Sequence, residues 1–288
     1  MRVRTRRRAV SASLLLVSGL VASGLAAAQG QPVAPLRPVT NDYFGTPVVD
    51  NYRYMEDLGN ADVKAWMKTQ ADYTRSKLDA IPARKPLLER IHALSNADLR
   101  RGGFVRRGDR YFYEVFEPGA QLPKLYYRDG LKGEEHLLLD PGAMGKGTET
   151  HYALDFFEPS WDGKLLAYGV SVGGSEKSVL HVMDVATGTV QPEAIDRTSD
   201  SLVSWRPDNR SFFYLRYVKP TPGMPADQTM YNARTYLHVL GKNADGEADP
   251  VVFGRGVAPG LDVPEGQSTW LVTAPDSPYV LALSLIHI

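Results

Sequence analysis

The chain has 288 residues, of which 43% are hydrophobic and 23% are charged, so its composition excludes a collagen-like fibre and a wholly disordered chain. This length allows one large domain or two ordinary ones. Lys and Arg together number 33, as do Asp and Glu, and the formal net charge is zero. The 20 prolines, 26 glycines and 15 tyrosines favour a turn-rich β protein over a helical bundle.

The positive charge is concentrated at the amino terminus. Five arginines lie within the first eight residues: Arg2, Arg4, Arg6, Arg7 and Arg8. Without them, 28 basic side chains stand against 33 acidic ones, a net charge of −5. We therefore expect no basic surface for nucleic acid or for an anionic membrane.

An apolar run of small residues, Ala9–Ala28, follows the arginines and ends in three alanines. A positive segment, an apolar segment and small residues at a cleavage site are typical of a secretory signal peptide. A transmembrane anchor is the alternative, but the run is rich in Ser, Gly and Ala, and Pro32, Pro35 and Pro38 follow it. We expect residues 1–28 to be a cleaved signal peptide, which predicts a periplasmic or secreted protein without a stable membrane anchor. The sequence does not distinguish the general export route from the twin-arginine route. Without cysteine, stability must come from the core and not from disulfides.

Helical periodicity follows a proline-rich linker. Asn60 or Asp62 can cap a helix that Pro82 ends. Its apolar side recurs at three- and four-residue spacing: Val63, Trp66, Met67, Tyr73 and Thr74. Pro86 opens a second short helix, whose apolar residues share one side: Leu87, Leu88, Ile91 and Leu94. Periodicity alone predicts two amphipathic helices that pack on the part of the chain after them.

From about Gly103 the period changes to two, and an internal repeat appears. Its unit is a turn containing Asp, followed by an apolar strand. The four copies are Gly108–Tyr113, Trp161–Tyr168, Pro207–Tyr214 and Pro275–Leu281, with Asp-to-Asp spacings of 53, 46 and 68 residues. In the second copy a further strand, Ser178–Val185, ends at the tight turn Ala186-Thr187-Gly188. An irregular β-sandwich would not produce the same unit four times, so we predict a mainly β fold built as a propeller.

Several segments resemble one protein family, in family order. They are Tyr52-Arg53-Tyr54-Met55-Glu56-Asp57, the Trp66-bearing helix to Leu78, Gly133-Glu134-Glu135, Leu138-Leu139-Asp140, residues 160–171, Asp184–Gly188 and Leu237–Gly241. Together they resemble the amino-terminal part of the prolyl oligopeptidase family of serine peptidases over about residues 40–284. The resemblance implies a seven-bladed propeller that caps an α/β-hydrolase domain, with the amino-terminal helices packed on the hydrolase. It also implies hydrolysis of short peptides, often after proline, by a Ser–Asp–His triad.

Length limits how much of that architecture the chain holds. Seven blades of about 50 residues need about 350 residues, whereas 186 remain from Gly103 onward. We expect a signal peptide at 1–28, a linker and helices at 29–102, and an incomplete propeller of three to four blades at 103–288. On this interpretation the hydrolase domain is missing, the intact enzyme is a monomer, and the fragment is inactive and prone to aggregate through unpaired strand edges.

One motif matches the sequence pattern of a catalytic serine nucleophile. Gly169-Val170-Ser171-Val172-Gly173-Gly174 fits the G-x-S-x-G-G form of the family's active-site turn, which requires a strand before the serine and a helix after it. A strand precedes Ser171, but Val179–Val182 alternates as a second strand. We expect Ser171 in a loop of a blade hairpin. His181 is ten residues on, and His238 and His287 show no paired acid in the sequence.

No other residue is predicted to belong to a site. Glu134 and Glu135 could resemble the glutamates with which dipeptidyl peptidases hold a substrate's amino terminus, but solvated turn carboxylates are favoured. The six histidines have no metal-ligand spacing, and Gly142–Gly147 lacks the Lys-Ser/Thr ending of a phosphate loop. We therefore assign no catalytic, cofactor-binding or metal-binding residue, and no cofactor.

Two functions remain open. The first is the amino-terminal portion of an exported prolyl-oligopeptidase-like serine endopeptidase, whose propeller gates access for short peptides. The second is a non-catalytic periplasmic propeller that acts as a binding module. The 52–78 segment favours the first, because it suits docking beside a hydrolase domain.

Overall fold

The computed structural model describes residues 30–95, 97–198, 203–231, 233–245 and 249–285. The expected signal peptide lies outside the described residues. The chain divides into two compact units, residues 1–90 and residues 91–288, and each is described by itself.

The first unit contains a hairpin within the segment expected to be a linker. β1 (Val39–Tyr43) pairs antiparallel with β2 (Thr46–Asp50). Tyr43 lies opposite Thr46, so the turn has two residues, Phe44 and Gly45, both at positive φ (56° and 85°). Such turns match the twist of a hairpin but normally carry Asn or Gly at both positions. Phe44 therefore weakens the turn signal in the sequence.

Two helices follow the short 3-10 helix η1 (Arg53–Glu56), as expected. α1 spans Ala61–Asp79, and Asn60 is its cap, because the Asn60 side chain accepts a hydrogen bond from the Asp62 amide at 2.9 Å. α2 spans Arg84–Ser95 and begins two residues earlier than Pro86 predicts. Proline is tolerated there, because amides of the first turn have no helical partner. The apolar side of α2 is exposed at Leu87, Leu88, Ile91 and Leu94.

The second unit is built from four antiparallel sheets in chain order. The first sheet contains β3 (Arg100–Arg107), β4 (Arg110–Phe116), β5 (Lys124–Asp129) and β6 (His136–Leu139). The second contains β7 (Tyr152–Pro159), β8 (Leu165–Val172), β9 (Ser178–Asp184) and β10 (Val190–Thr198). The third contains β11 (Ser204–Trp205), β12 (Ser211–Arg216), β13 (Arg234–Val239) and β14 (Val251–Phe253). The fourth pairs β15 (Ser268–Val272) with β16 (Leu281–Leu285), and two short helices, α3 (Pro141–Met144) and η2 (Ala226–Thr229), lie in connections.

Each copy of the predicted repeat forms the hairpin between the first and second strands of one sheet. In the second and third copies the aspartate holds the turn: Asp162 accepts a hydrogen bond from the Lys164 amide (3.1 Å), and Asp208 accepts one from the Arg210 amide (2.9 Å). The first copy differs, since Gly108 and Asp109 form a two-residue loop and the Asp109 side chain is 89% exposed. The copies thus share their place in the sheet topology, whereas their turns are of two different kinds.

Three apolar cores lie between successive sheets. Phe112 and Leu125 of the first sheet pack with Leu166 and Tyr168 of the second. The other two cores join the second sheet to the third, around Phe156, Leu180, Trp205 and Phe212, and the third to the fourth, around Phe213, Phe253 and Leu271. Neighbouring residues such as Phe212 and Phe213 enter different cores, because successive side chains of a strand point to opposite sides of the sheet. This two-sided burial explains the continuous apolar runs in the repeat.

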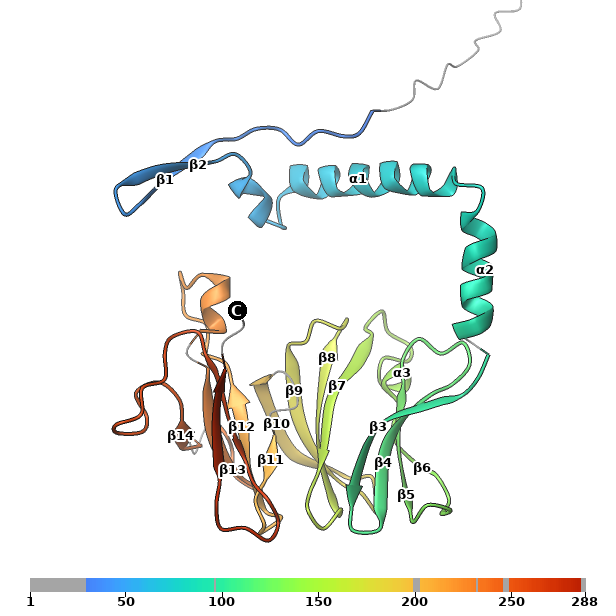
Figure 1. Ribbon diagram of the computed structural model, residues 1–288, viewed down its shortest axis with the longest axis vertical. Helices are drawn as coiled ribbons and strands as arrows, with labels where there is room; N and C mark the ends of the chain where they lie inside the picture. The colour runs from blue at the N-terminus through green and yellow to red at the C-terminus, as the bar shows by residue number, and fades with distance from the viewer. Residues whose placement is uncertain (1–29, 96, 199–202, 232, 246–248, 286–288) are drawn as a thin grey trace, which may run out of the picture. The chain divides into compact units, whose positions relative to one another are not determined.

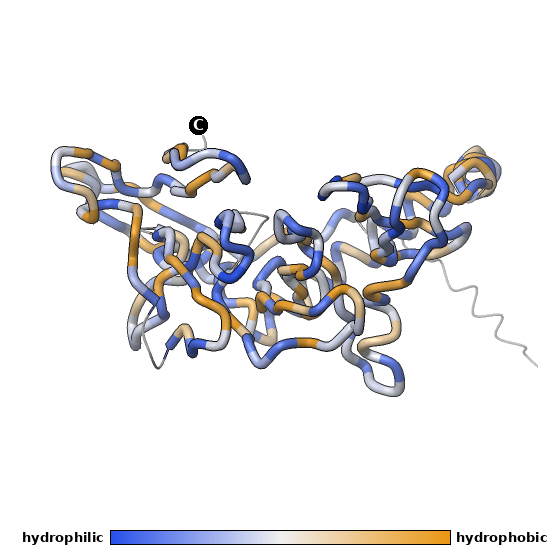
Figure 2. The backbone as a smooth tube through the Cα atoms, turned by 90° about the horizontal axis from the view of Figure 1, so that it is seen from below, coloured by the Kyte–Doolittle hydropathy of each residue, from blue (hydrophilic) through white to orange (hydrophobic). Residues whose placement is uncertain are grey.

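Figure 1 shows the four sheets side by side in chain order, in a row that does not close into a ring. Figure 2 shows hydrophobic and hydrophilic stretches alternating along the backbone. The prediction of a mainly β, partial propeller of three to four blades is confirmed: within the described residues, three sheets of the second unit have four strands and the last has two.

Candidate functional site

Ser171 lies within β8 and not in the expected loop. The residue is 2% exposed, and its hydroxyl donates a hydrogen bond to Asp155 Oδ1 at 3.0 Å. The Ser178 hydroxyl donates to the other oxygen of the same carboxylate at 2.5 Å. Ser171 is therefore a buried strand residue that ties β8 to β7.

The glycines around Ser171 serve the hairpin. A Cβ on Gly169 would lie 2.1 Å from the Phe156 ring, so this glycine lets the ring pack on β8. Gly173 and Gly174 have φ of 61° and 66° and form the turn that leads to β9. Because a strand follows this turn, Ser171 has no helix amino terminus to stabilise an oxyanion.

The histidine next along the chain does not serve Ser171. His181 on β9 lies opposite Tyr168, and its Nδ1 is 3.2 Å from the Glu193 carbonyl oxygen. Burial lowers the pKa of His181. No serine–histidine pair forms at this motif among the described residues.

His238 has the acid partner that the sequence did not indicate, so that expectation is wrong. His238 Nδ1 lies 2.9 Å from Asp249 Oδ2, and the Tyr214 hydroxyl donates to the same oxygen at 2.9 Å. All three side chains are buried. Burial, then the neighbouring Asp249 carboxylate, raises the pKa of Tyr214. The eleven-residue separation between His238 and Asp249 hides this pair from any local motif.

A chain of contacts links the first strands of successive sheets. We name it the first-strand network, and it consists of Arg107, Glu158, Trp161, Trp205 and Thr273. Trp161 Nε1 donates to the Trp205 carbonyl at 2.6 Å, and Trp205 Nε1 donates to the Glu158 carbonyl at 2.9 Å. The Thr273 hydroxyl donates to the Trp205 carbonyl at 2.5 Å. The network thus runs from the first strand of the first sheet to Thr273, the residue directly after β15 of the fourth.

Arg107 and Glu158 form the charged end of this network. The Arg107 guanidinium pairs with the Glu158 carboxylate, donates to the Pro159 carbonyl at 3.1 Å and lies over the Trp161 ring at 4.5 Å. Burial raises the pKa of Glu158 to about 7, although the Arg107 charge opposes that shift. Burial also lowers the pKa of Arg107, despite the attraction of Glu158. Arg107 and Glu158 each lie shortly before the turn of a repeat copy. This shared position in the repeat is the sequence feature that could have indicated the pair.

The paired glutamates have different surroundings. Glu134 is exposed in the turn before β6, as expected. Glu135 is half-buried and accepts hydrogen bonds from Arg101 Nε (2.8 Å) and the Tyr113 hydroxyl (2.8 Å). The Arg101 guanidinium is the main reason that the pKa of Glu135 is lowered. Burial, followed by the hydrogen bond between the Tyr113 hydroxyl and Glu135, raises the pKa of Tyr113 to about 12. Glu135 is thus a bridge between β3 and β4 and not a solvated turn residue.

Among the described residues, no cluster of three or more His, Asp or Glu side chains is suited to a metal ion. None of the helices in the described ranges is both long enough and apolar enough to cross a membrane.

Comparison with known proteins identifies the fold. Residues 32–259 match the family described as "Prolyl oligopeptidase, N-terminal beta-propeller domain". A prolyl endopeptidase from Elizabethkingia meningoseptica is 31% identical over 203 residues, which cover 70% of this chain and 28% of that protein. Dipeptidyl aminopeptidase BI from Pseudoxanthomonas mexicana is 26% identical over 257 residues, which cover 82% of this chain and 34% of that protein.

Solved structures of prolyl endopeptidases and oligopeptidases have a similar fold. One, from "Structural and Mechanistic Analysis of Two Prolyl Endopeptidases: Role of Inter-Domain Dynamics in Catalysis and Specificity", superposes with a TM-score of 0.75 at 27% identity, over 89% of this chain and 36% of that one. Prolyl oligopeptidase B from Galerina marginata superposes with a TM-score of 0.68 at 20% identity, over 88% of this chain and 37% of that one, and this likeness shows the fold alone. The chain thus spans about a third of the length of these relatives.

Proposed function

The chain belongs to the prolyl oligopeptidase family through its N-terminal β-propeller domain, and from that premise we propose that it is the propeller portion of an exported serine peptidase. The substrates are short peptides, often cleaved after proline. The nucleophile, acid and base belong to a hydrolase domain outside these 288 residues. The observation that carries the proposal is the match over residues 32–259 together with four sheets in propeller order.

Exposed apolar side chains on the first and last sheets support a larger propeller. Phe104 on β3 and Leu137 on β6 are 54% and 51% exposed. On the fourth sheet, Leu281 and Leu285 are 59% and 61% exposed. In the interior of the row, equivalent strands are covered on both sides by neighbouring sheets. Further blades would bury these residues, and a complete ring would restrict entry to the catalytic cavity to short, unfolded peptides.

The peptidase proposal is tested by activity. The purified chain, incubated with a proline-containing chromogenic peptide, should show no turnover beside a full-length prolyl endopeptidase as positive control. The matched variant is Ser171→Ala, which should behave like the unchanged chain. Clear turnover that Ser171→Ala abolishes would overturn the assignment of the chemistry to another domain.

Export is tested separately. If residues 1–28 are a signal peptide, protein recovered from the periplasm or medium of a bacterial host should begin at Gln29. Amino-terminal sequencing of that fraction measures this directly. A protein that stays inside the cell with Met1 retained contradicts export, and it leaves the peptidase proposal to its own test.

A further inference from the structure

One arginine of the first blade makes a set of contacts with the second blade. Arg107, the last residue of β3, forms an ion pair with Glu158 of β7. The same guanidinium donates a hydrogen bond to the Pro159 carbonyl at 3.1 Å and lies 4.5 Å from the centroid of the Trp161 ring. We name these three contacts the Arg107 clasp.

The other blades offer Glu158 no charged partner. Glu158 lies two residues after Phe156, which packs in the core between the second and third sheets, so the two side chains share one side of β7. Glu158 also lines a cavity of about 220 Å³, and the residues of the third and fourth sheets that line it are uncharged: Val203, Ser204, Trp205, Trp270, Leu271, Val272 and Thr273. Arg107 is therefore the counter-ion of this carboxylate.

The charged side chains at the neighbouring turns have partners of their own. Arg110, at the start of β4, pairs with Asp129 at 2.7 Å. In the turn of the second blade, Lys164 pairs with Asp162 at 3.8 Å. These ion pairs each join residues of one blade and do not involve Glu158.

Proton binding by Glu158 and the hold on Arg107 are linked. Burial raises the pKa of Glu158 to about 7, whereas the charge and hydrogen bond of Arg107 act to lower it. By thermodynamic reciprocity, the factor by which Arg107 favours loss of the proton is also the factor by which uptake of the proton weakens the hold on Arg107. The guanidinium, which is 13% exposed, then loses its counter-ion, and a largely buried charge without a counter-ion is costly.

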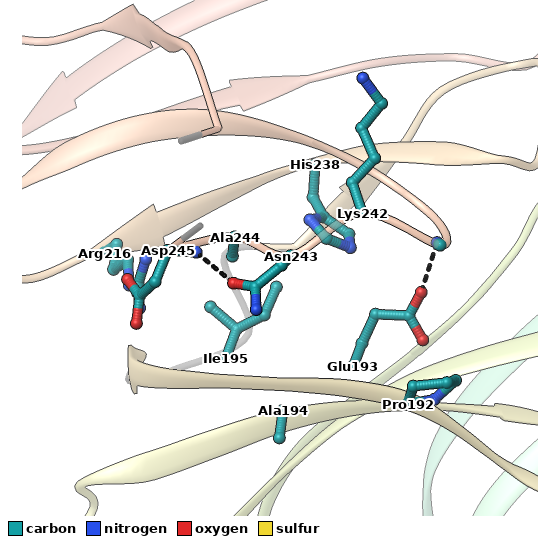
Figure 3. A pocket seen from close by; sticks show the side chains of 11 residues that line it. Pro192, Glu193, Ala194, Ile195, Arg216, His238, Lys242, Asn243, Ala244 and Asp245 are labelled. Carbon is teal, nitrogen blue, oxygen red and sulfur yellow. Dashed lines mark hydrogen bonds and ion pairs between the residues drawn. The ribbon is translucent and has the colours of Figure 1, made fainter. Parts of the chain in front are cut away.

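The second and third blades are joined by an ion pair of a different kind. Arg216 of β12 lies 2.5 Å from Asp196 of β10 and 2.8 Å from Asp245, beside which Figure 3 shows it. Burial acts to raise the pKa of Asp196, but the hydrogen bonds from Arg216 and Arg197 hold it below its ordinary value. Because this carboxylate is ionised throughout the neutral range, the contact does not respond to pH there.

We propose that the Arg107 clasp is a proton-operated contact between the first and second blades. Ionised Glu158 holds Arg107 on the second blade. A proton that the carboxylate takes from solvent releases the guanidinium toward solvent and loosens the two blades at their first strands. The change is between two folded arrangements, unlike unfolding, which exposes Glu158 itself, and it does not depend on the peptidase proposal.

Chemical modification of arginine by phenylglyoxal, followed by digestion and mass spectrometry, measures this release on the purified chain at low micromolar concentration. Exposed Arg75 of α1 is the internal reference, because it corrects for the pH dependence of the reagent. The ratio of Arg107 to Arg75 modification should rise about fivefold or more as pH falls from about 8.5 to about 6, the lower end of common coupling strengths. The corresponding ratio for Arg216 should stay constant.

Two variants assign the effect to Glu158. Glu158→Gln resembles the protonated state and does not titrate, so its Arg107 ratio should be high at every pH. Asp129→Asn removes the partner of neighbouring Arg110 and is the matched control, and its Arg107 ratio should follow that of the unchanged chain. An Arg107 ratio that is constant with pH in the unchanged chain, or that rises equally in Glu158→Gln, would overturn the proposal.

Discussion

Glu158 and Arg107 are a partly buried ion pair in the first strands of two blades, with side chains 24% and 13% exposed. Removing two charges from water is costly, and their attraction offsets that cost only where the geometry is good. Here burial raises the pKa of Glu158 to about 7 in spite of its partner. The pair therefore makes stability sensitive to pH in the neutral range.

The sign of that effect follows from proton linkage. An unfolded glutamate titrates near 4.5, whereas folded Glu158 keeps its proton to about pH 7, so the folded chain binds more protons. Its contribution to stability is complete below the lower value and is lost as pH rises through the upper one. We expect Glu158→Gln to flatten the fall in the free energy of unfolding between these pH values.

Urea unfolding at low micromolar concentration, followed by tryptophan fluorescence, measures the slope. Glu134→Gln, an exposed carboxylate of the same kind, is the control and should retain the slope of the unchanged chain. Equal slopes for Glu158→Gln and the unchanged chain would contradict the assigned pKa.

The close packing of the Phe156 ring on Gly169 can also be tested. A methyl group there would lie 2.1 Å from the Phe156 ring, which must move. We expect Gly169→Ala to reduce the free energy of unfolding by about 1–3 kcal/mol, the usual cost of overpacking. Gly102→Ala is the matched strand control, since nothing lies within 4 Å of its added methyl. Similar urea midpoints for the two variants would show that Gly169 is not required for packing.

Single residues show what local sequence can and cannot predict. The sequence shows that a strand and not a helix follows the turn after Ser171, because both strands of this hairpin are local features, but Ser171 itself lies within β8 and not in the predicted loop. The partner of His238 was not, since Asp249 is brought to it by the pairing of β13 with β14. Arg107 and Glu158 are 51 residues apart and meet only because two sheets pack together.

Among elements, periodicity predicted those whose residues are locally consistent. α1 and the four repeat hairpins carry caps, turn residues and apolar runs that agree with one another. The β1–β2 hairpin was missed because Phe44 occupies a position of positive φ. α2 was predicted with a buried apolar side, but its leucines are exposed in the described chain.

The Asn60 cap at the start of α1 can be tested by mutation. Asn60 satisfies the Asp62 amide, which has no helical partner of its own. We expect Asn60→Ala to destabilise the helix by about 1 kcal/mol, with faster amide hydrogen exchange in its first turns. Asn60→Asp retains the acceptor and should exchange like the unchanged chain. Exchange rates equal in all three proteins would mean that the cap does not hold the helix end.

For the whole molecule, the open row of sheets has a consequence in solution. Apolar side chains on its first and last sheets are exposed, including Phe104, Leu137 and Leu281, and unpaired sheet edges promote association. We expect light scattering of the purified chain to show a mass that increases with concentration. A monomer at every concentration, melting in one cooperative step, contradicts an incomplete propeller.

Above all, we propose that these residues form the propeller part of a longer serine peptidase. The most direct measurement is the nucleotide sequence that comes after codon 288 in the source gene. We expect a continuous reading frame that adds further blade repeats and then G-x-S-x-G-G in a strand–turn–helix context, followed by an aspartate and a histidine. A frame that closes the propeller and stops without a hydrolase domain would contradict it and favour a binding module.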